Sequence, residues 1–220
     1  KNIQFYSDQA VKKSISSEEK ARDWRYKKLS ERAKKLLIED KQKKNIYILT
    51  GHTNTDNAET FILNLARGSS YAGLSHIEKK RLLENKIFLI RPILILSRID
   101  TKEFCNKMNV PIWEDPTNSD LKIKRNLIRQ EILPILETIY PGCSERINNF
   151  SKKMRNYNSE REDLGKLATL SCKNKQSLNR NLLNSLCIEA RSTILNRFIK
   201  ENCTKQLNSK NLSYLASSIF

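Results

Sequence analysis

The residue types that break, bend or cross-link a fold are scarce in this chain of 220 residues. It contains five glycines, five prolines, five cysteines and two histidines. The cysteines are odd in number and widely scattered, with no CxxC pair, so the sequence offers no zinc or iron–sulfur ligand set of short spacing. No apolar run approaches the roughly eighteen residues that a membrane span needs. We therefore expect a soluble, intracellular protein with free thiols.

Acidic side chains are also in short supply, because 41 lysines and arginines stand against 24 aspartates and glutamates, and the net charge is +17. An excess of this size favours a polyanionic partner, since phosphate contacts supply much of the affinity for nucleic acids. The other explanation is lysine enrichment in an AT-rich genome, which would place the extra lysines on solvated faces. The chain is long enough for one α/β domain and a smaller second domain.

The stretch from residue 46 to residue 60 combines the clearest structural and chemical signals. The apolar run Ile46–Leu49 predicts a buried strand that stops at Gly51. Apolar residues spaced three and four apart then predict a helix that ends at Arg67-Gly68. In open α/β sheets, ligands bind at the loop after a strand, so we expect the chemistry here, beside His52.

Asp56 and Glu59 lie one helical turn apart in this stretch and allow two interpretations. They can form a capping box at the start of the helix, with Glu59 three residues after Asp56. They can equally project into the crevice with His52, as a carboxylate pair for a cation or a metal ion. Spacing alone does not choose between the helix cap and the binding site.

Helices and strands alternate in the first half of the chain. A helix over residues 17–39 follows a capping box formed by Ser16 and Glu19, and its apolar residues share one face. Residues 87–90 predict a second buried strand. Alternation of this kind is typical of an α/β fold with a parallel sheet.

A change of character follows. Ser97 caps a helix that runs to about Met108, with Phe104 and Met108 turned inward, and a turn-rich acidic segment covers residues 114–120. We place the domain boundary in that segment, which gives an α/β domain over residues 1–118 and a small all-α domain over residues 119–220. In the second domain, Pro134 should kink or restart the first helix, and Pro141-Gly142 should end it. The further helices are expected at residues 144–170, 178–200 and 208–220.

Six short motifs, read together, resemble one family. In chain order they are Glu19-x-Ala21-Arg22-x-x-Arg25-Tyr26, Gly51-His52 with Asp56 and Ala58-Glu59-Thr60, Leu65-x-Arg67-Gly68-Ser69 with Ala72-Gly73-Leu74, Arg91-Pro92 with Ser97-Arg98, Trp113-x-Asp115-Pro116-Thr117-Asn118, and Arg125-Asn126-x-x-Arg129. Each motif is weak by itself, but all six in this order are specific. The chain resembles the tRNA(Ile)-lysidine synthetases, a family of the PP-loop ATP-pyrophosphatase superfamily with a Rossmann-like sheet, over roughly residues 16–150.

The resemblance implies an activity and its substrates. The family joins L-lysine to C2 of the wobble cytidine in an isoleucine tRNA with a CAU anticodon. ATP, expected together with Mg²⁺, first adenylates the C2 oxygen, and the lysine ε-amine then displaces AMP to give lysidine. The implied setting is the bacterial cytoplasm, with the plastid stroma as the alternative, and a homodimer is left open.

The resemblance also suggests roles for particular residues. The implied catalytic residues are Asp56, Glu59 and His52, the implied nucleotide contacts are Gly51, His52 and Arg22, and the implied tRNA contacts are Arg67, Arg125, Asn126 and Arg129. Asp56 is also the candidate ligand for Mg²⁺. Asp115 is expected to cap and orient its turn rather than to take part in the chemistry.

The sequence departs from the family in one large and two small respects. The family begins with a strand and a Ser-Gly-Gly-x-Asp-Ser loop that cradles the pyrophosphate of ATP, and this segment is not in the sequence. We expect the chain to be an N-terminally incomplete piece of the enzyme. Thr55 and Gln130 stand where the family often has aspartate and histidine, which, with Thr53, resembles the cyanobacterial or plastid branch.

Two other functions are weighed against lysidine synthesis. A tRNA-binding remnant that has shed its ATP loop would account for the same departure without catalysis. A tRNA thiolase of the same superfamily is disfavoured, because the chain has no CxxC pair for sulfur chemistry.

Overall fold

The computed structural model describes residues 3–10, 18–39, 44–75, 77–203 and 207–218. These residues form two compact units. The first unit comprises the described residues up to Arg67 together with those from Ile77 to Asn148, and the second comprises Gly68–Ser75 and the described residues from Asn149 onward. Each unit is described by itself below.

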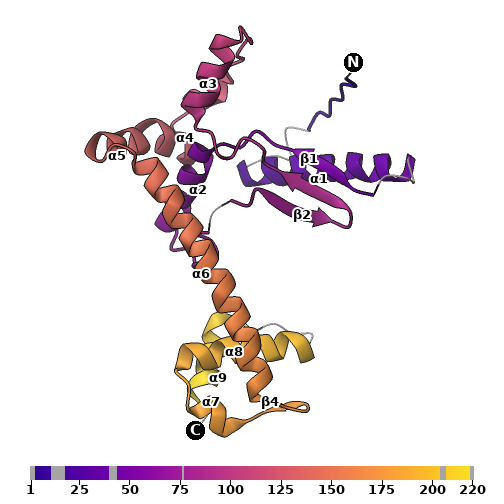
Figure 1. The fold of residues 1–220 in the computed structure, drawn as a ribbon, viewed down its shortest axis with the longest axis vertical. Coiled ribbons are helices and arrows are strands. Elements are labelled where there is room, and N and C mark those ends of the chain that lie inside the picture. The colour runs from indigo at the N-terminus through magenta and orange to yellow at the C-terminus, as the bar shows by residue number, and fades with distance from the viewer. Residues whose placement is uncertain (1–2, 11–17, 40–43, 76, 204–206, 219–220) are drawn as a thin grey trace. The chain divides into compact units, whose positions relative to one another are not determined.

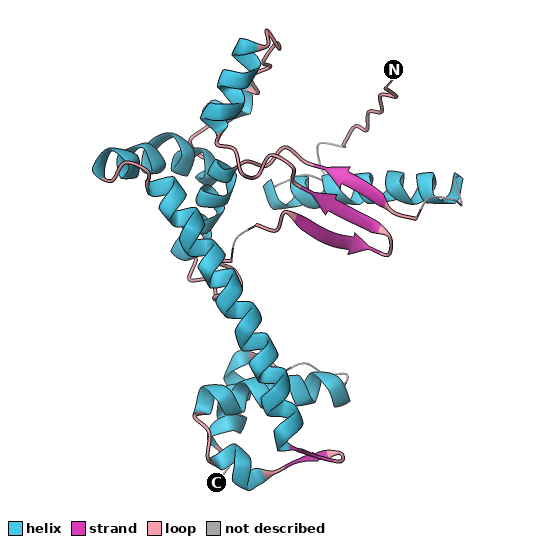
Figure 2. Ribbon diagram, viewed as in Figure 1, coloured by secondary structure: helices cyan, strands magenta, loops and turns pink. Residues whose placement is uncertain are grey.

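The first unit contains a three-stranded mixed sheet in the order β1-β3-β2 (Figures 1 and 2). Strands β1 (Ile46–Leu49) and β3 (Ile87–Ile90) are parallel, with Ile46 opposite Ile87 and Leu49 opposite Ile90. Both strands and their parallel pairing are confirmed. The expected burial of β1 is wrong, because Tyr47 and Leu49 are 48% and 63% exposed and only Ile48 is buried. Strand β2 (Lys80–Glu84) runs antiparallel to β3 and was not predicted, because its five residues include three charged side chains and lack an apolar alternation.

Helix α1 (Glu18–Glu39) covers one face of this sheet (Figure 1). Its Ala33 is buried against Ile48, Ile87 and Leu89, as expected of a helix with one apolar face. The predicted helix over residues 17–39 is confirmed within its described residues. Ser16 of the predicted capping box lies outside the described part of the chain.

Helix α3 (Arg98–Lys107) begins as predicted but does not pack as predicted. Ser97 is its N-cap, with a capping box to Asp100, and Met108 is its C-cap. The expected inward orientation of Phe104 and Met108 is wrong, because these side chains are 60% and 62% exposed. A periodic apolar residue marks one face of a helix, but only the tertiary structure determines whether another element covers that face.

The chain then passes through a 3₁₀ turn, η2 (Pro116–Ser119), into a segmented helix. Its parts are α4 (Lys124–Leu127), a π-helical turn η3 (Ile128–Ile132) and α5 (Leu133–Ile139). Pro134 stands in the first turn of α5, where its missing N–H costs least, so the predicted restart of the helix is confirmed. Gly142 has a φ of 80°, a left-handed conformation that suits the end of this run.

Helix α6 (Cys143–Cys172) is the longest helix, and the division between the two units falls within it. The elements after it are the short hairpin β4 (Lys173–Asn174) and β5 (Ser177–Leu178), α7 (Arg180–Asn184), α8 (Ile188–Asn202) and α9 (Ser209–Ser217). The predicted helix over residues 178–200 is therefore two helices, α7 and α8. In the second unit, Ile194 packs against Cys172 and Leu183, while Leu195 packs against Leu212 and Ala216.

The compact units divide after Asn148, whereas composition placed a domain boundary at residues 118/119. The difference arises because α4, η3 and α5 pack on the first unit, where Ile128 and Leu133 share a core with Ala58. As a division between a nucleotide-binding and a tRNA-contacting part, the earlier boundary stays a prediction. None of the helices in the described part of the chain is long and apolar enough to cross a membrane.

Candidate functional site at the carboxyl end of strand β1

The loop that leaves β1 leads directly into helix α2 (Asn54–Ala66). Thr53 is the N-cap, and its hydroxyl accepts a hydrogen bond from the Asp56 N–H. Asp56 Oδ2 accepts hydrogen bonds from the backbone N–H and the hydroxyl of Thr53, each at 2.8 Å. The capping box therefore runs from Thr53 to Asp56, and the predicted box from Asp56 to Glu59 is wrong. The predicted end of the helix at Arg67-Gly68 is confirmed, and Gly68 has a φ of 71°.

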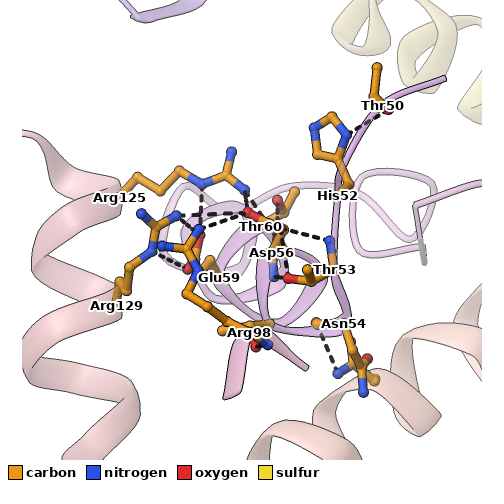
Figure 3. Close-up of polar contacts among 12 residues, drawn as sticks. Thr50, His52, Thr53, Asn54, Asp56, Glu59, Thr60, Arg98, Arg125 and Arg129 are labelled. Atoms are coloured by element: carbon orange, nitrogen blue, oxygen red, sulfur yellow. Dashed lines mark hydrogen bonds and ion pairs between the residues drawn. The ribbon is translucent and has the colours of Figure 1, made fainter. Parts of the chain in front are cut away.

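Glu59 is fully buried and holds two arginines from the segmented helix (Figure 3). Its Oε2 accepts from Arg125 Nε at 2.7 Å, and its Oε1 accepts from Arg129 Nε at 2.5 Å. Arg129 Nη2 also donates to Oε2 at 2.8 Å. Both carboxylate oxygens of Glu59 are engaged, so this side chain fixes the position of two guanidinium groups.

Asp56 completes a charged cluster that consists of Asp56, Glu59, Arg98, Arg125 and Arg129. Its Oδ1 lies 3.1 Å from Arg125 Nη2, 3.7 Å from Arg129 Nη2 and 3.9 Å from Arg98 Nη2. Burial raises the pKa of Asp56, but the hydrogen bonds from Thr53 and the charges of Arg125 and Arg98 outweigh burial and hold that pKa below its usual value. Three guanidinium groups against two carboxylates leave one positive charge in excess.

His52 lies between β1 and α2, on the other side of Asp56 from Arg129 (Figure 3). Its Nδ1 is 2.9 Å from the Thr50 hydroxyl. Burial and the positive charges of Arg91, Arg125 and Arg22 lower the pKa of His52 to about 4, although Asp56 opposes them. The imidazole is therefore neutral near pH 7, and the charges around it are mainly positive.

Arg91 lies in the site, although from the sequence it was recognised only as part of the Arg91-Pro92 motif. It follows β3 as Thr50 follows β1, and the carboxyl ends of two parallel strands meet at one edge of a sheet. Its side chain is 2% exposed, and Nη1 donates to the Glu78 carbonyl at 2.6 Å, while Nε has no hydrogen-bond partner. Burial lowers the pKa of Arg91, as do the charges of Arg81 and Arg22. Its place directly after a buried strand was the signal that could have identified it.

The other predicted site residues, Arg22, Asn126 and Arg67, lie at three different elements, α1, α4 and the end of α2. Arg22 contributes to the positive potential at His52, and its guanidinium lies over the Tyr26 ring at 5.6 Å. Asn126 is buried and donates to the carbonyls of Thr117 and Asp120, so it holds the turn before α4. Arg67 is the C-cap of α2, at the opposite end of that helix from Asp56.

Asp115 acts as predicted. Its Oδ1 accepts from the backbone N–H of Thr117 at 2.9 Å and from the Thr117 hydroxyl at 2.8 Å. These hydrogen bonds lower the pKa of Asp115. The side chain caps the 3₁₀ turn.

The carboxylates do not fit a magnesium ion in this arrangement. Asp56 and Glu59 are both paired with arginines, and the described residues contain no group of three histidine, cysteine, aspartate or glutamate side chains that could hold a metal ion. The positive cluster is better suited to an anion, such as the phosphates of a nucleotide.

A cavity of about 750 Å³ opens beside the cluster, within the first unit. Gly51, Asp56 and Arg129 contribute to its lining, and a Cβ on Gly51 would meet the Ile93 side chain at 3.9 Å. Residues of α3 and of the segment from Ile112 to Pro116 complete it. The cavity joins the charged cluster to an exposed part of the surface.

Comparison with known proteins shows which family this chain resembles. Residues 2–136 match the PP-loop domain family. The chain is 70% identical over 219 residues to the tRNA(Ile)-lysidine synthase of Prochlorococcus marinus subsp. pastoris, which covers 100% of this chain and 65% of that relative. It is 41% identical to the tRNA(Ile)-lysidine synthase of Prochlorococcus marinus strain NATL1A, over 99% of this chain and 67% of the relative. A chloroplastic tRNA(Ile)-lysidine synthase of Gracilaria tenuistipitata is 34% identical over 76% of this chain and 53% of the relative. The chain thus spans about two-thirds of the length of its Prochlorococcus relatives.

Proposed function

The chain belongs to the tRNA(Ile)-lysidine synthase family of PP-loop proteins, and we propose that it carries out ATP-dependent attachment of L-lysine to the wobble cytidine of an isoleucine tRNA. The observation that carries this proposal is the excess positive charge at the carboxyl end of β1, where Arg98, Arg125 and Arg129 surround two carboxylates. A PP-loop domain with such a cluster is suited to a phosphorylated substrate.

The proposed reaction has two balanced steps. The C2 oxygen of cytidine attacks the α-phosphorus of ATP, so a C2–O–P linkage forms and diphosphate leaves. The lysine ε-ammonium loses one proton to solvent, and the free amine attacks C2. The C2–O bond breaks, AMP leaves, and the nitrogen releases a second proton and keeps the third. Both steps move negative charge onto phosphate oxygens, which nearby guanidinium groups stabilise.

Arg22 and Arg91, which act on His52 electrostatically, attract the phosphates, and the neutral imidazole of His52 hydrogen-bonds the nucleotide beside Gly51. Glu59 positions Arg125 and Arg129.

Asp56 is the proposed partner of the lysine ammonium. Its Oδ1 accepts from Arg125 Nη2 at 3.1 Å but lies only loosely against Arg98 and Arg129, at 3.9 and 3.7 Å, so the ammonium can replace those two longer contacts. In the same proposal, Arg67, Arg125, Asn126 and Arg129 hold the tRNA. The setting is the bacterial cytoplasm, and the protein forms a homodimer.

Transfer of radiolabelled lysine to isoleucine tRNA tests the proposal. The assay uses this chain and a version preceded by the Ser-Gly-Gly-x-Asp-Ser segment of the family, with ATP present or omitted. We expect ATP-dependent transfer to the CAU tRNA, loss of transfer in Asp56→Asn with tRNA affinity kept within a few-fold, and no effect of the exposed control Asp23→Asn. Absence of transfer by both versions would overturn the proposal.

A further inference from the structure

Trp113 is exposed to an unusual degree for its residue type. Its side chain is 79% exposed, although tryptophan is highly buried on average in folded proteins. It lines the cavity of about 750 Å³ that Gly51 and Asp56 also line. A large flat ring therefore stands at a cavity that reaches the charged cluster, which is the arrangement of a binding surface rather than of a core.

The rest of the cavity lining supplies donors and acceptors of both signs. Lys102 brings an ammonium group and Glu114 a carboxylate, and Gln130 brings an amide whose Nε2 donates to the Asn118 carbonyl and whose Oε1 can accept. Arg98 and Arg129 reach the same cavity, but Arg129 is held by Glu59, and Arg98 lies 3.9 Å from Asp56. Mixed polarity of this kind suits the edge of a nucleobase, whereas a polyphosphate would need an excess of positive charge.

We propose that Trp113 is a stacking platform for an unpaired pyrimidine of an RNA loop, with the base edge facing Lys102, Glu114 and Gln130. The inference rests on the proposed function, because stacking on Trp113 would place the tRNA cytidine in the same cavity. Single-stranded loops are recognised by stacking of splayed bases on aromatic rings, and a carboxylate accepts from the exocyclic amine of cytosine. RNA is preferred over a protein partner because the net charge is +17.

Tryptophan fluorescence can report the contact directly, because the chain contains only Trp24 and Trp113. In a Trp24→Phe background, an RNA stem-loop with CAU in its loop is expected to quench the Trp113 emission saturably. The same stem closed without an unpaired loop is expected to leave the emission unchanged. Trp113→Ala should weaken binding of the loop RNA by about ten- to a hundredfold, and Trp113→Phe should retain most of the affinity.

The matched control is Ile95→Ala, since Ile95 is 76% exposed but does not line the cavity. It should bind the loop RNA within twofold of the parent. An unquenched Trp113, an equal loss in Ile95→Ala, or no loss in Trp113→Ala would each overturn the inference. Lysine transfer that persists in Trp113→Ala would reject the stacking role alone, whereas quenching by the loop RNA without lysine transfer would reject the proposed function alone.

Discussion

At the scale of single residues, Glu59 is the carboxylate on which the candidate site depends. It is fully buried and accepts hydrogen bonds from Arg125 and Arg129, which come from a segment more than sixty positions later in the chain. A buried charge that loses its partner costs far more than an exposed one. The ion pairs of Glu59 therefore have two effects. They hold α2 against α4 and η3, and they fix the orientation of the two guanidinium groups.

Replacing Glu59 by glutamine should destabilise the protein. Glu59→Gln keeps the size of the side chain but leaves two partly buried arginines with less negative charge, so we expect a loss of about 3–5 kcal/mol in the free energy of unfolding. Urea denaturation followed by circular dichroism measures it. Glu103→Gln, on the exposed side of α3, is the matched control and should change the value by less than about 0.5 kcal/mol. Equal stability of both variants would show that Glu59 does not hold the arginines.

His52 gives a prediction about pH. Its pKa is lowered from 6.5 to about 4 by burial and nearby arginines, so the folded state resists a proton that the unfolded chain accepts. The resulting stability is complete above pH 6.5 and is lost as the pH falls toward 4. Titration of the imidazole proton signals by NMR should give a midpoint near pH 4 for His52, with His76→Gln used to assign the signals.

A matched variant checks the link to stability. His52→Gln removes the titrating group, so the fall in melting temperature between pH 6.5 and pH 4 should be shallower than in the parent. A midpoint near 6.5 for His52, together with parallel melting curves, would contradict the proposed positive surroundings.

At the scale of elements, the start of α6 is tied to the start of α2. Asn148 Nδ2 donates to the Asn54 carbonyl at 3.1 Å, and its Oδ1 accepts from Asn57 Nδ2. Asn57 Oδ1 in turn accepts from the Ile77 backbone N–H at 2.8 Å. These contacts hold α2, and therefore the loop that carries His52, against two other parts of the first unit.

Removing this tie should lower stability without touching the charged cluster. Asn148→Ala deletes two hydrogen bonds between buried groups, and we expect a loss of about 1–3 kcal/mol in the free energy of unfolding by urea denaturation. Its neighbour Asn149 is exposed on the same helix, so Asn149→Ala serves as the control and should have little effect. A similar small change in both variants would mean that α2 is positioned by its apolar contacts alone.

At the scale of the whole molecule, the charge excess is spread over both units, whereas the chemistry predicted from sequence lies in the first. Arginines and lysines occur in the second unit along α8 and along the part of α6 after Asn148, and arginines lie around His52 in the first unit. A long polyanion such as tRNA can use such an extended set of charges, and its affinity then depends steeply on salt. This distribution of charge supports an RNA, rather than a small anion alone, as the partner.

The sequence alone determined the local elements and the family. Strands 46–49 and 87–90, the helix ends at Arg67-Gly68 and Ser97, and the turn capped by Asp115 follow from short-range periodicity and capping chemistry, which need only neighbouring residues. The motifs likewise predicted the family, because their order is carried by the chain itself.

The tertiary structure decided which side chains meet. Asp56 and Glu59 are one helical turn apart in sequence, but their partners Arg125 and Arg129 come from a distant helix, and no local pattern encodes that pairing. The exposure of Phe104, the antiparallel strand β2 and the burial of Arg91 depend in the same way on packing between segments far apart in the chain. The stretch after β1 was identified from sequence as a candidate site, and its net positive character emerged only when three arginines were brought to two carboxylates.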